Sequence, residues 1–144
     1  MTVFADTFAL IAWLNPRDDS HASVTAYLDG FTGRLVTTEW VLMEVADALS
    51  APTARSTAVA FLQAVRADPL FDVIGYDLAV YRAGFDLFAA RPDKAWSLTD
   101  CIAFAVMTER GLSDALTADH HFEQLVFGCI QIATLSASRA CAFH

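Results

Sequence analysis

The sequence is poor in positive charge. Lys94 is its one lysine, and the eight arginines are scattered along the chain rather than clustered. With seventeen acidic residues, the formal net charge is −8 and the pI is near 4.7. A protein that holds nucleic acid through a broad basic surface has the opposite balance, so the composition argues against that class. An acidic site that binds Mg²⁺ or Mn²⁺ would account for part of the negative charge.

Paired cysteines and long apolar segments are also missing. The three cysteines, Cys101, Cys129 and Cys141, show no CxxC spacing, which is typical of reduced intracellular thiols. No apolar stretch reaches the roughly 20 residues that a membrane-spanning helix needs, and no basic region leads into an apolar segment at the start. We therefore expect a cytoplasmic protein with no membrane association and no signal peptide.

Apolar residues are plentiful. They make up 56% of the 144 residues, against 18% charged residues, which is ample for the core of one domain. The sequence contains no repeat, linker or low-complexity tract, so residues 1–144 are expected to form a single domain. The apolar surplus suggests that a partner or a second copy covers part of the surface.

Short apolar runs alternate with stretches of helical periodicity. The predicted strands span residues 3–5, 35–37, 71–74, 115–118 and 131–135. The predicted helices span residues 7–14, 21–31 and 38–50, a segment ending near Arg66, residues 77–90, and a segment ending at Arg110. This alternation predicts an α/β fold with a central, mostly parallel sheet of four to five strands and helices on both faces. Ligands of such sheets gather beyond the carboxyl ends of the strands.

Two aspartates stand at predicted strand ends. Asp6 follows the strand 3–5, and Asp119 follows the strand 115–118. Either could simply cap a helix or turn, because aspartate is a preferred N-cap residue. If both strands belong to one parallel sheet, however, the two carboxylates lie at its ligand-binding edge.

Two further acids belong to predicted helices. Asp100 closes the tetrapeptide Ser97-Leu98-Thr99-Asp100, which has the form of a capping box. Glu44 lies at the margin of the apolar side of helix 38–50, where a glutamate is seldom buried without a partner. Its alternative role is that of a solvated or arginine-paired edge residue. Glu39 and Asp47, on the same helix, are predicted to be solvent-facing charges.

Taken together, the four acids indicate a cation site. Each pair of carboxylates within roughly 5 Å would cost about 3 kcal/mol at an effective dielectric near 20. Such a cluster persists by taking up protons or by binding a hard cation. Oxygen ligands without paired Cys or His favour Mg²⁺ or Mn²⁺ over zinc, and this arrangement suits metal-assisted phosphodiester hydrolysis.

Other polar groups stand beside these acids. His120 and His121 follow Asp119 directly, where an imidazole could approach a phosphate or could be purely structural. The hydroxyl residues Thr7, Ser97 and Thr117 could steer carboxylates or waters, and capping explains the first two equally well.

The four acidic stretches, in this order, resemble the motifs of the PIN-domain nucleases and, more narrowly, the VapC-type toxins of bacterial toxin–antitoxin pairs. The stretches are VFADTFALIAWL with Asp6, LVTTEWVLMEVADAL with Glu44, WSLTDCIAFAVMTERG with Asp100, and ALTADHHFEQL with Asp119. The resemblance implies one PIN-like domain over residues 1–144, with the site-bearing motifs within residues 3–125. Residues 126–144 match the family pattern less well.

The resemblance also implies a function. It points to a Mg²⁺- or Mn²⁺-dependent ribonuclease that hydrolyses RNA phosphodiester bonds, forms a homodimer and is neutralised by a cognate antitoxin. By the same resemblance, Asp6 and Asp100 are direct metal ligands, and Glu44 and Asp119 complete the acidic pocket through water. It assigns neither a substrate-binding residue nor the RNA that is cut.

The basic residues that could contact phosphate are few. The candidates, each of which could equally be an ordinary surface residue, are Arg17, Arg82, Arg91, Lys94 and Arg110. A dimer could join two weakly basic edges into one groove.

Two other functions fit parts of the pattern. An aspartate-based phosphotransfer domain also uses strand-end aspartates, but the position two residues after Asp6 is Phe8, where such phosphatases carry a second aspartate. Alternatively, the chain is a catalytically inert PIN-like binding module that keeps the fold without activity.

Overall fold

A single parallel sheet organises the part of the chain that the computed structural model describes, which is residues 1–117 and 129–131. Its strands are β1 (Thr2–Ala5), β2 (Arg34–Thr38), β3 (Phe71–Ile74), β4 (Ala115–Thr117) and β5 (Cys129–Gln131). They lie in the order β3-β2-β1-β4-β5, and every neighbouring pair is parallel. The predicted α/β fold with a sheet of four to five strands is therefore confirmed.

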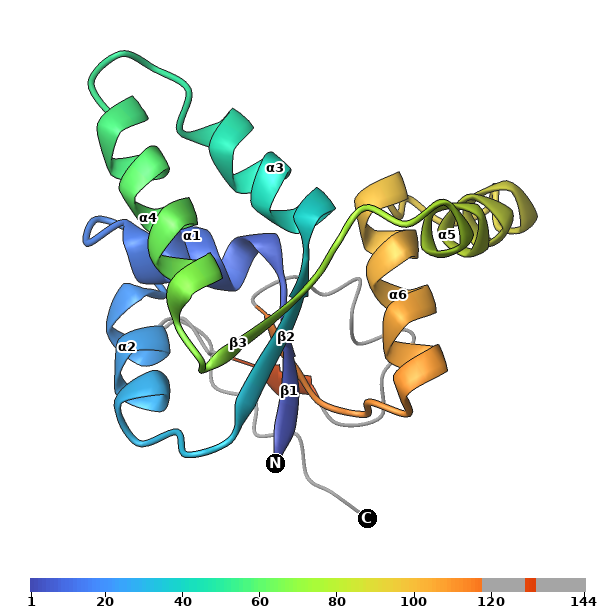
Figure 1. Ribbon diagram of the computed structural model, residues 1–144, viewed down its shortest axis with the longest axis horizontal. Coiled ribbons are helices and arrows are strands. Elements are labelled where there is room, and N and C mark those ends of the chain that lie inside the picture. Colours follow the sequence, from blue (N-terminus) through green and yellow to red (C-terminus); the bar gives the residue numbers. More distant parts are fainter. Residues whose placement is uncertain (118–128, 132–144) are drawn as a thin grey trace.

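Helices cover both faces of this sheet. They are α1 (Thr7–Leu14), α2 (His21–Asp29), α3 (Glu39–Ala48), α4 (Arg55–Ala67), α5 (Leu78–Ala90) and α6 (Leu98–Arg110). Figure 1 shows α1, α2 and α4 on one side of the sheet and α5 and α6 on the other. Right-handed crossovers explain this, because the chain moves one way from β1 to β3 and the opposite way from β3 to β4.

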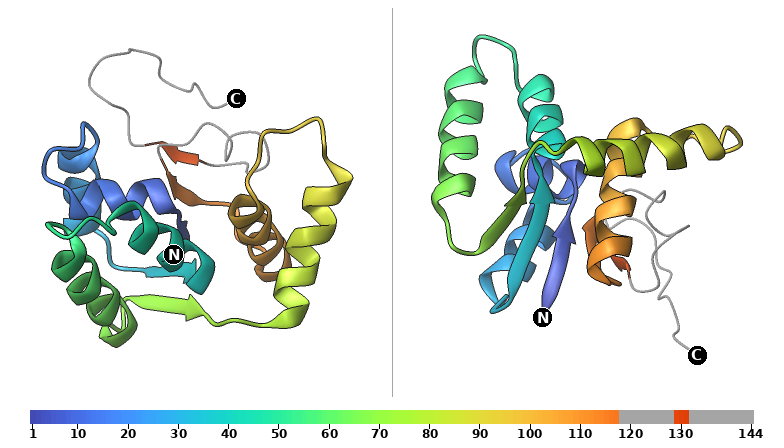
Figure 2. Two further views of the ribbon diagram at one scale, coloured as in Figure 1. Left: turned by 90° about the horizontal axis from the view of Figure 1, so that it is seen from above. Right: turned by 45° about the vertical axis from the view of Figure 1, so that its right-hand side comes forward.

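The strand order reverses between β1 and β4. From β1 the chain continues outward through β2 and β3, whereas β4 and β5 extend the sheet on the other side. In parallel sheets such a reversal opens a crevice beyond the carboxyl ends of the strands. Helix α3 starts at that edge and contacts α1, α4 and α6, so it bridges the two helical layers there (Figure 2).

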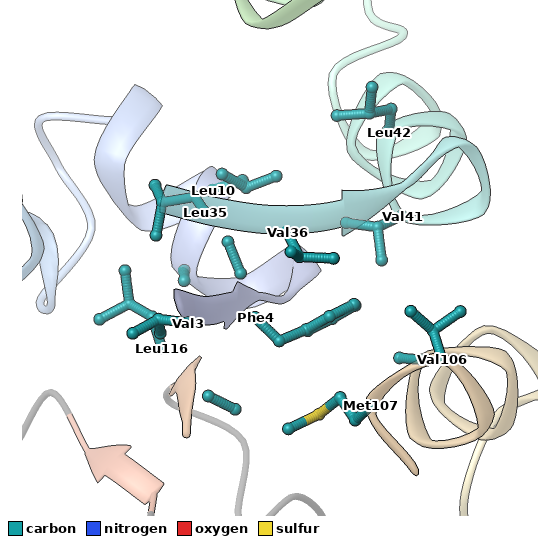
Figure 3. Close-up of a cluster of buried hydrophobic side chains, with 14 of the residues drawn as sticks. Val3, Phe4, Leu10, Leu35, Val36, Val41, Leu42, Val106, Met107 and Leu116 are labelled. Carbon is teal, nitrogen blue, oxygen red and sulfur yellow. The ribbon is translucent and has the colours of Figure 1, made fainter. Parts of the chain in front are cut away.

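The core follows the alternation of side chains along the strands. Val3 and Phe4 are both fully buried, as expected for strands covered on two faces. Figure 3 shows Phe4 extending toward Val106 and Met107 of α6, whereas Val3 points to the opposite side of the sheet. The buried residues of both layers belong to one cluster, so the sheet and its helices share a continuous core.

Small differences from the predicted elements occur at their ends. Helix α2 ends at Asp29 rather than at residue 31, and β5 includes residues 129–131, whereas residues 132–135 of the predicted last strand lie outside the described residues. The position of β5 is set by pairing with β4, in which Ala115 lies opposite Cys129. No helix in the described part of the chain combines the length and the apolar character needed to cross a bilayer.

The α5–α6 pair is held at short distance by Gly84. A Cβ atom at this buried glycine would lie 2.3 Å from Cγ1 and 2.7 Å from Cα of Ile102 on α6. Since the second of these is a backbone atom, the helices cannot accommodate a methyl group by rotating a side chain.

We therefore predict that Gly84→Ala lowers the free energy of unfolding by about 1–3 kcal/mol through overpacking. An exposed helical glycine would show the opposite sign, since alanine is favoured by about 1 kcal/mol. The matched control is Gly75→Ala, because no atom lies within 4 Å of a Cβ atom built there. Urea denaturation followed by circular dichroism measures both variants, and a Gly84→Ala variant as stable as the Gly75→Ala control would contradict the packing argument.

Candidate active site

Among the predicted acidic site residues that the structure describes, Asp6 is the most deeply buried. It follows β1, caps α1 and is only 2% exposed. Its Oδ1 accepts a hydrogen bond of 2.7 Å from the backbone N–H of Ala9, and its Oδ2 accepts one from the hydroxyl of Thr117. A carboxylate is buried at such a position only when donors compensate for its lost hydration. Asp6 therefore caps α1, and it also lies at the carboxyl edge of the sheet.

Thr117 comes from the neighbouring strand, on the other side of the crevice. It ends β4 and is fully buried. The backbone N–H of Asp6 also donates to the carbonyl of Leu116, at 3.3 Å, so β1 and β4 are joined just below the carboxylate. The side-chain bond therefore fixes the Asp6 carboxylate at the reversal of strand order, where α/β sheets bind their ligands.

Asp100 occupies the first turn of α6 and forms the predicted capping box. Its Oδ2 accepts from the backbone N–H of Ser97 at 3.1 Å, and its own N–H donates to the Ser97 hydroxyl at 3.0 Å. Because α6 precedes β4 and runs against the strands, its first turn lies at their carboxyl edge (Figure 1). Asp100 and Asp6 therefore belong to the same end of the sheet.

Glu44 lies on α3 and is half-buried. In the described part of the chain, no arginine or lysine forms an ion pair with it, so it is not the arginine-paired edge residue of the alternative interpretation. Glu39, by contrast, was predicted to be a solvent-facing charge, and this is wrong, because its side chain is only 16% exposed. Its two oxygens accept from Arg66 at 3.0 and 2.6 Å, which ties α3 to α4 and raises the pKa of Arg66.

The described residues do not by themselves form a complete metal site. Within residues 1–117 and 129–131, no three Asp, Glu, His or Cys side chains form a group that could hold an ion. Asp119, His120 and His121 lie outside the described residues. The four-acid ligand set remains a prediction.

A basic loop leads from α5 to the first turn of α6. Within it, Arg91 and Lys94 both lie over the ring of buried Trp96, at 5.3 and 5.7 Å from its centroid. Hydrogen bonds from Arg91 lower the pKa of the Asp93 carboxyl to about 2, so this exposed pair stays charged at neutral pH. Both cations were predicted from the sequence as candidates for phosphate contacts, whereas the role of Trp96 in positioning them was not. An aromatic residue between basic residues and a capping box is a pattern from which this role could have been predicted.

Two further groups near the sheet, Arg110 and Cys101, are engaged elsewhere or unsuited to chemistry. Arg110 pairs with Asp72 at 2.6 Å, which neutralises much of its charge locally. Burial, together with the negative charge of Asp100, raises the pKa of the Cys101 thiol. Cys101 is therefore a neutral thiol at physiological pH rather than a nucleophile.

The bond between Asp6 and Thr117 gives a direct test of the site's construction. We predict that Thr117→Val lowers the free energy of unfolding by about 1–3 kcal/mol, since a buried carboxylate loses a donor while its surroundings keep their shape. Thr117→Ser keeps the hydroxyl and should lose less. Urea denaturation at pH 7 compares the two, and a valine variant more stable than the serine variant would show that the hydroxyl does not stabilise the site.

The fold has close counterparts among solved structures. Mycobacterium tuberculosis VapC20, described as a sarcin–ricin loop cleaving toxin, superposes with a TM-score of 0.78 at 22% identity, covering 85% of this chain and 93% of that one. A toxin–antitoxin complex from Klebsiella pneumoniae gives a TM-score of 0.65 at 16% identity, with 92% and 99% covered. FitAcB from Neisseria gonorrhoeae gives 0.64 at 16% identity, with 92% and 98% covered.

The sequence comparisons add a family assignment. Among curated proteins the sequence has no significant match. It does match the PIN domain family over residues 3–128, which spans all four acidic stretches and most of the chain. Together with the parallel sheet and the buried strand-end aspartate, this match establishes that the chain belongs to the PIN domain family.

Proposed function

We propose that this chain is a divalent-metal-dependent endoribonuclease that hydrolyses RNA phosphodiester bonds, and that it is the toxin of a toxin–antitoxin pair. The observation that carries the proposal is Asp6, a buried carboxylate held at the reversal of strand order in a PIN domain. Maintaining a negative charge in such a place costs stability. A functional role for the charge explains why the fold bears that cost.

The donor set fits a hard cation. Asp6 and Asp100 offer carboxylate oxygens at the same end of the sheet, and Glu44 lies on the helix that bridges both layers there. Oxygen donors of this kind suit Mg²⁺ or Mn²⁺. In our proposal Asp6 and Asp100 bind the ion directly, while Glu44 and Asp119 act through water.

The chain's own residues then orient the proposed metal ligands and contact the substrate. Thr117 and the first turn of α1 hold Asp6 in one orientation, and the capping box holds Asp100. When bound, a divalent ion supplies a more acidic water and neutralises charge that develops on the phosphate. Lys94, placed just before α6, is the nearest described cation in the sequence to Asp100 and is proposed to contact the RNA backbone, whereas much of the charge of Arg91 is neutralised by Asp93.

The toxin role is supported by the proteins that share the fold. Each counterpart is matched over more than nine-tenths of its length. One is a toxin that cleaves the sarcin–ricin loop and another is a toxin–antitoxin complex. We infer by analogy a cognate antitoxin partner, a homodimeric assembly and a cytoplasmic site of action. A neighbouring reading frame for a small DNA-binding protein would support the pairing.

We predict that the purified full chain cleaves structured RNA in the presence of Mn²⁺ or Mg²⁺ and loses this activity in EDTA. Asp6→Asn should reduce the rate by more than about 100-fold, because a neutral amide is a poor ligand for a hard cation. Asparagine still caps helices well, so the variant should fold. Gel analysis of labelled RNA hairpins measures the rate, and circular dichroism checks the fold.

The matched control is Asp29→Asn, the same chemical change at an exposed residue at the end of α2. It should leave the rate unchanged. Calorimetric binding of Mn²⁺ without cleavage of any RNA would favour the inert module instead. Stable incorporation of phosphate from acetyl phosphate, lost in Asp6→Asn, would favour the phosphotransfer domain.

A further inference from the structure

Two aromatic rings lie together beyond the carboxyl ends of β2 and β3. Trp40 is in the first turn of α3, which follows β2, and Tyr76 comes two residues after the end of β3. Their ring centroids are 5.2 Å apart with 76° between the ring planes, which is an edge-to-face contact. Figure 1 shows the segment that joins β3 to α5 passing between α3 and α6. The aromatic pair therefore belongs to the end of the sheet that carries the candidate active site.

The aromatic pair is connected to the acidic residues through α3 and β2. Trp40 and Glu44 are four residues apart on α3, so they are neighbours on one side of the helix. Near the end of β2, the hydroxyl of Thr37 donates to the carbonyl of Ala5 at 2.9 Å, and Ala5 directly precedes Asp6. Neighbouring strands are about 4.8 Å apart, so roughly 10 Å separates the ends of β1 and β3. At about 3.4 Å per nucleotide of a duplex strand, about three nucleotides span that distance.

Tyr76 is held in place but leaves much of its ring accessible. The residue is 64% exposed. Its edge-to-face contact with Trp40 occupies at most one face of the ring, and its hydroxyl donates a long hydrogen bond of 3.5 Å to the carbonyl of Glu39. Both contacts tie Tyr76 to the first turn of α3. One face of the ring is therefore available to a ligand.

A pocket of about 570 Å³ adjoins Tyr76 and is called the Tyr76 pocket below. Its volume falls within the roughly 300–1,000 Å³ that is typical of small-ligand pockets. The lining is mixed, with apolar atoms from Val80 and Val106 and carboxylates from Asp77 and Glu109. Carboxylates repel a phosphate group, whereas a nucleobase is neutral, flat and polar only at its edge. The pocket therefore suits a base better than the backbone of a nucleic acid.

The charge of the chain also favours contacts with bases. Phosphate contacts supply much of the affinity of nucleic-acid binders, but this chain has a net charge of −8 and a single lysine, Lys94. Stacking between a base and an aromatic ring requires no net charge, and each stacked base tightens binding by about 5- to 150-fold. Unpaired bases in RNA loops are the ones available for such stacking.

We propose that Tyr76, positioned by Trp40, stacks on an unpaired base of the RNA substrate and that the Tyr76 pocket receives this base. The inference rests on the proposed function, because it names the residues that hold the same substrate. The stacked base lies within about three nucleotides of the cleaved bond, by the strand spacing given above. The aromatic pair thereby sets which phosphodiester bond reaches the acidic edge.

Binding of hairpin RNA to the full chain carrying Asp6→Asn tests the proposal without cleavage. Fluorescence anisotropy compares labelled hairpins with adenine, cytosine or uracil loops, and a fully paired duplex of the same stem is the RNA control. Adding Tyr76→Ala should weaken binding of the preferred hairpin by about 5- to 150-fold, whereas Tyr76→Phe keeps the ring and should stay within about twofold. The duplex should show no such dependence, since its bases are already paired.

The matched control for Tyr76→Ala is Phe88→Ala. Phe88 is also an exposed aromatic residue, but it lies in the last turn of α5, the end of this helix that is farther from the sheet (Figure 2). Its removal should leave the affinity for RNA unchanged. Circular dichroism of each variant checks that the fold is kept. Equal losses in the two alanine variants would overturn the proposal.

A scan of abasic positions through the hairpin loop locates the stacked base. At that position, loss of the base should weaken binding to the Asp6→Asn chain and have little further effect once Tyr76→Ala is present. The loss caused by Tyr76→Ala should be the same at low and high salt, whereas the loss caused by Lys94→Ala should shrink as salt rises. Additive losses at every loop position, or RNA affinity unchanged by Tyr76→Ala, would overturn the proposal and leave the aromatic pair to a protein partner.

This outcome can be separated from that of the nuclease assay. If both proposals hold, Tyr76→Ala in the active chain raises KM by about 5- to 150-fold and leaves kcat within about twofold, as expected for a contact made equally in the ground and transition states. Metal-dependent cleavage whose KM is unchanged by Tyr76→Ala would overturn this inference and keep the proposed function. Tyr76-dependent binding of loop RNA by a chain that cleaves none would support this inference and contradict the proposed function.

Discussion

The buried carboxylate of Asp6 is the constraint on which the arrangement of the site depends. Its two oxygens accept from the first turn of α1 and from the end of β4, and Asp6 itself follows β1. Three elements from opposite ends of the sequence are thereby held together at one carboxyl group. The positive end of α1 favours the negative charge, so the helix stabilises the carboxylate as much as the carboxylate caps the helix. The position and orientation of the carboxyl group are consequently set by the fold itself.

The architecture could be predicted because its determinants are local. Apolar runs of three to five residues, interrupted by helical periodicity, specify a parallel sheet covered on both faces whatever the exact register. Register itself is a property of pairs of strands. The apolar segment after Cys129 allows several starting points for a strand, and only its pairing with Ala115 on β4 selects one. The start of the final strand was therefore predicted at residue 131 although residues 129 and 130 already pair with β4, whereas β3, whose bounds are marked by Pro69 and Gly75, was predicted correctly.

The distinction between local and long-range determinants also applies to the site. The strand-end position of Asp6 and the capping box of Asp100 are visible within a few residues of sequence. The hydroxyl that completes the Asp6 site lies 111 residues away. Its place near Asp119 indicated that Thr117 could steer a carboxylate, but only the pairing of β4 with β1 shows that this carboxylate is Asp6. Glu39 gives the complementary error, since its first-turn position suggested a solvent-facing charge, whereas its ion pair with Arg66 spans 27 residues. Long-range polar contacts are decided by the fold and become visible only once the strand order is known.

One stretch of chain carries exposed apolar side chains, basic residues and an acid of the candidate site. Residues 78–100 contain the exposed apolar side chains of α5, the loop in which Arg91 and Lys94 lie over Trp96, and finally Asp100. In a chain of net charge −8, the proposed RNA substrate would have to be attracted by local cations rather than by the overall field of the protein. Because Gly84 lets α5 pack closely on α6, the loop between these helices is anchored at both of its ends, and its cations keep a fixed position relative to the first turn of α6.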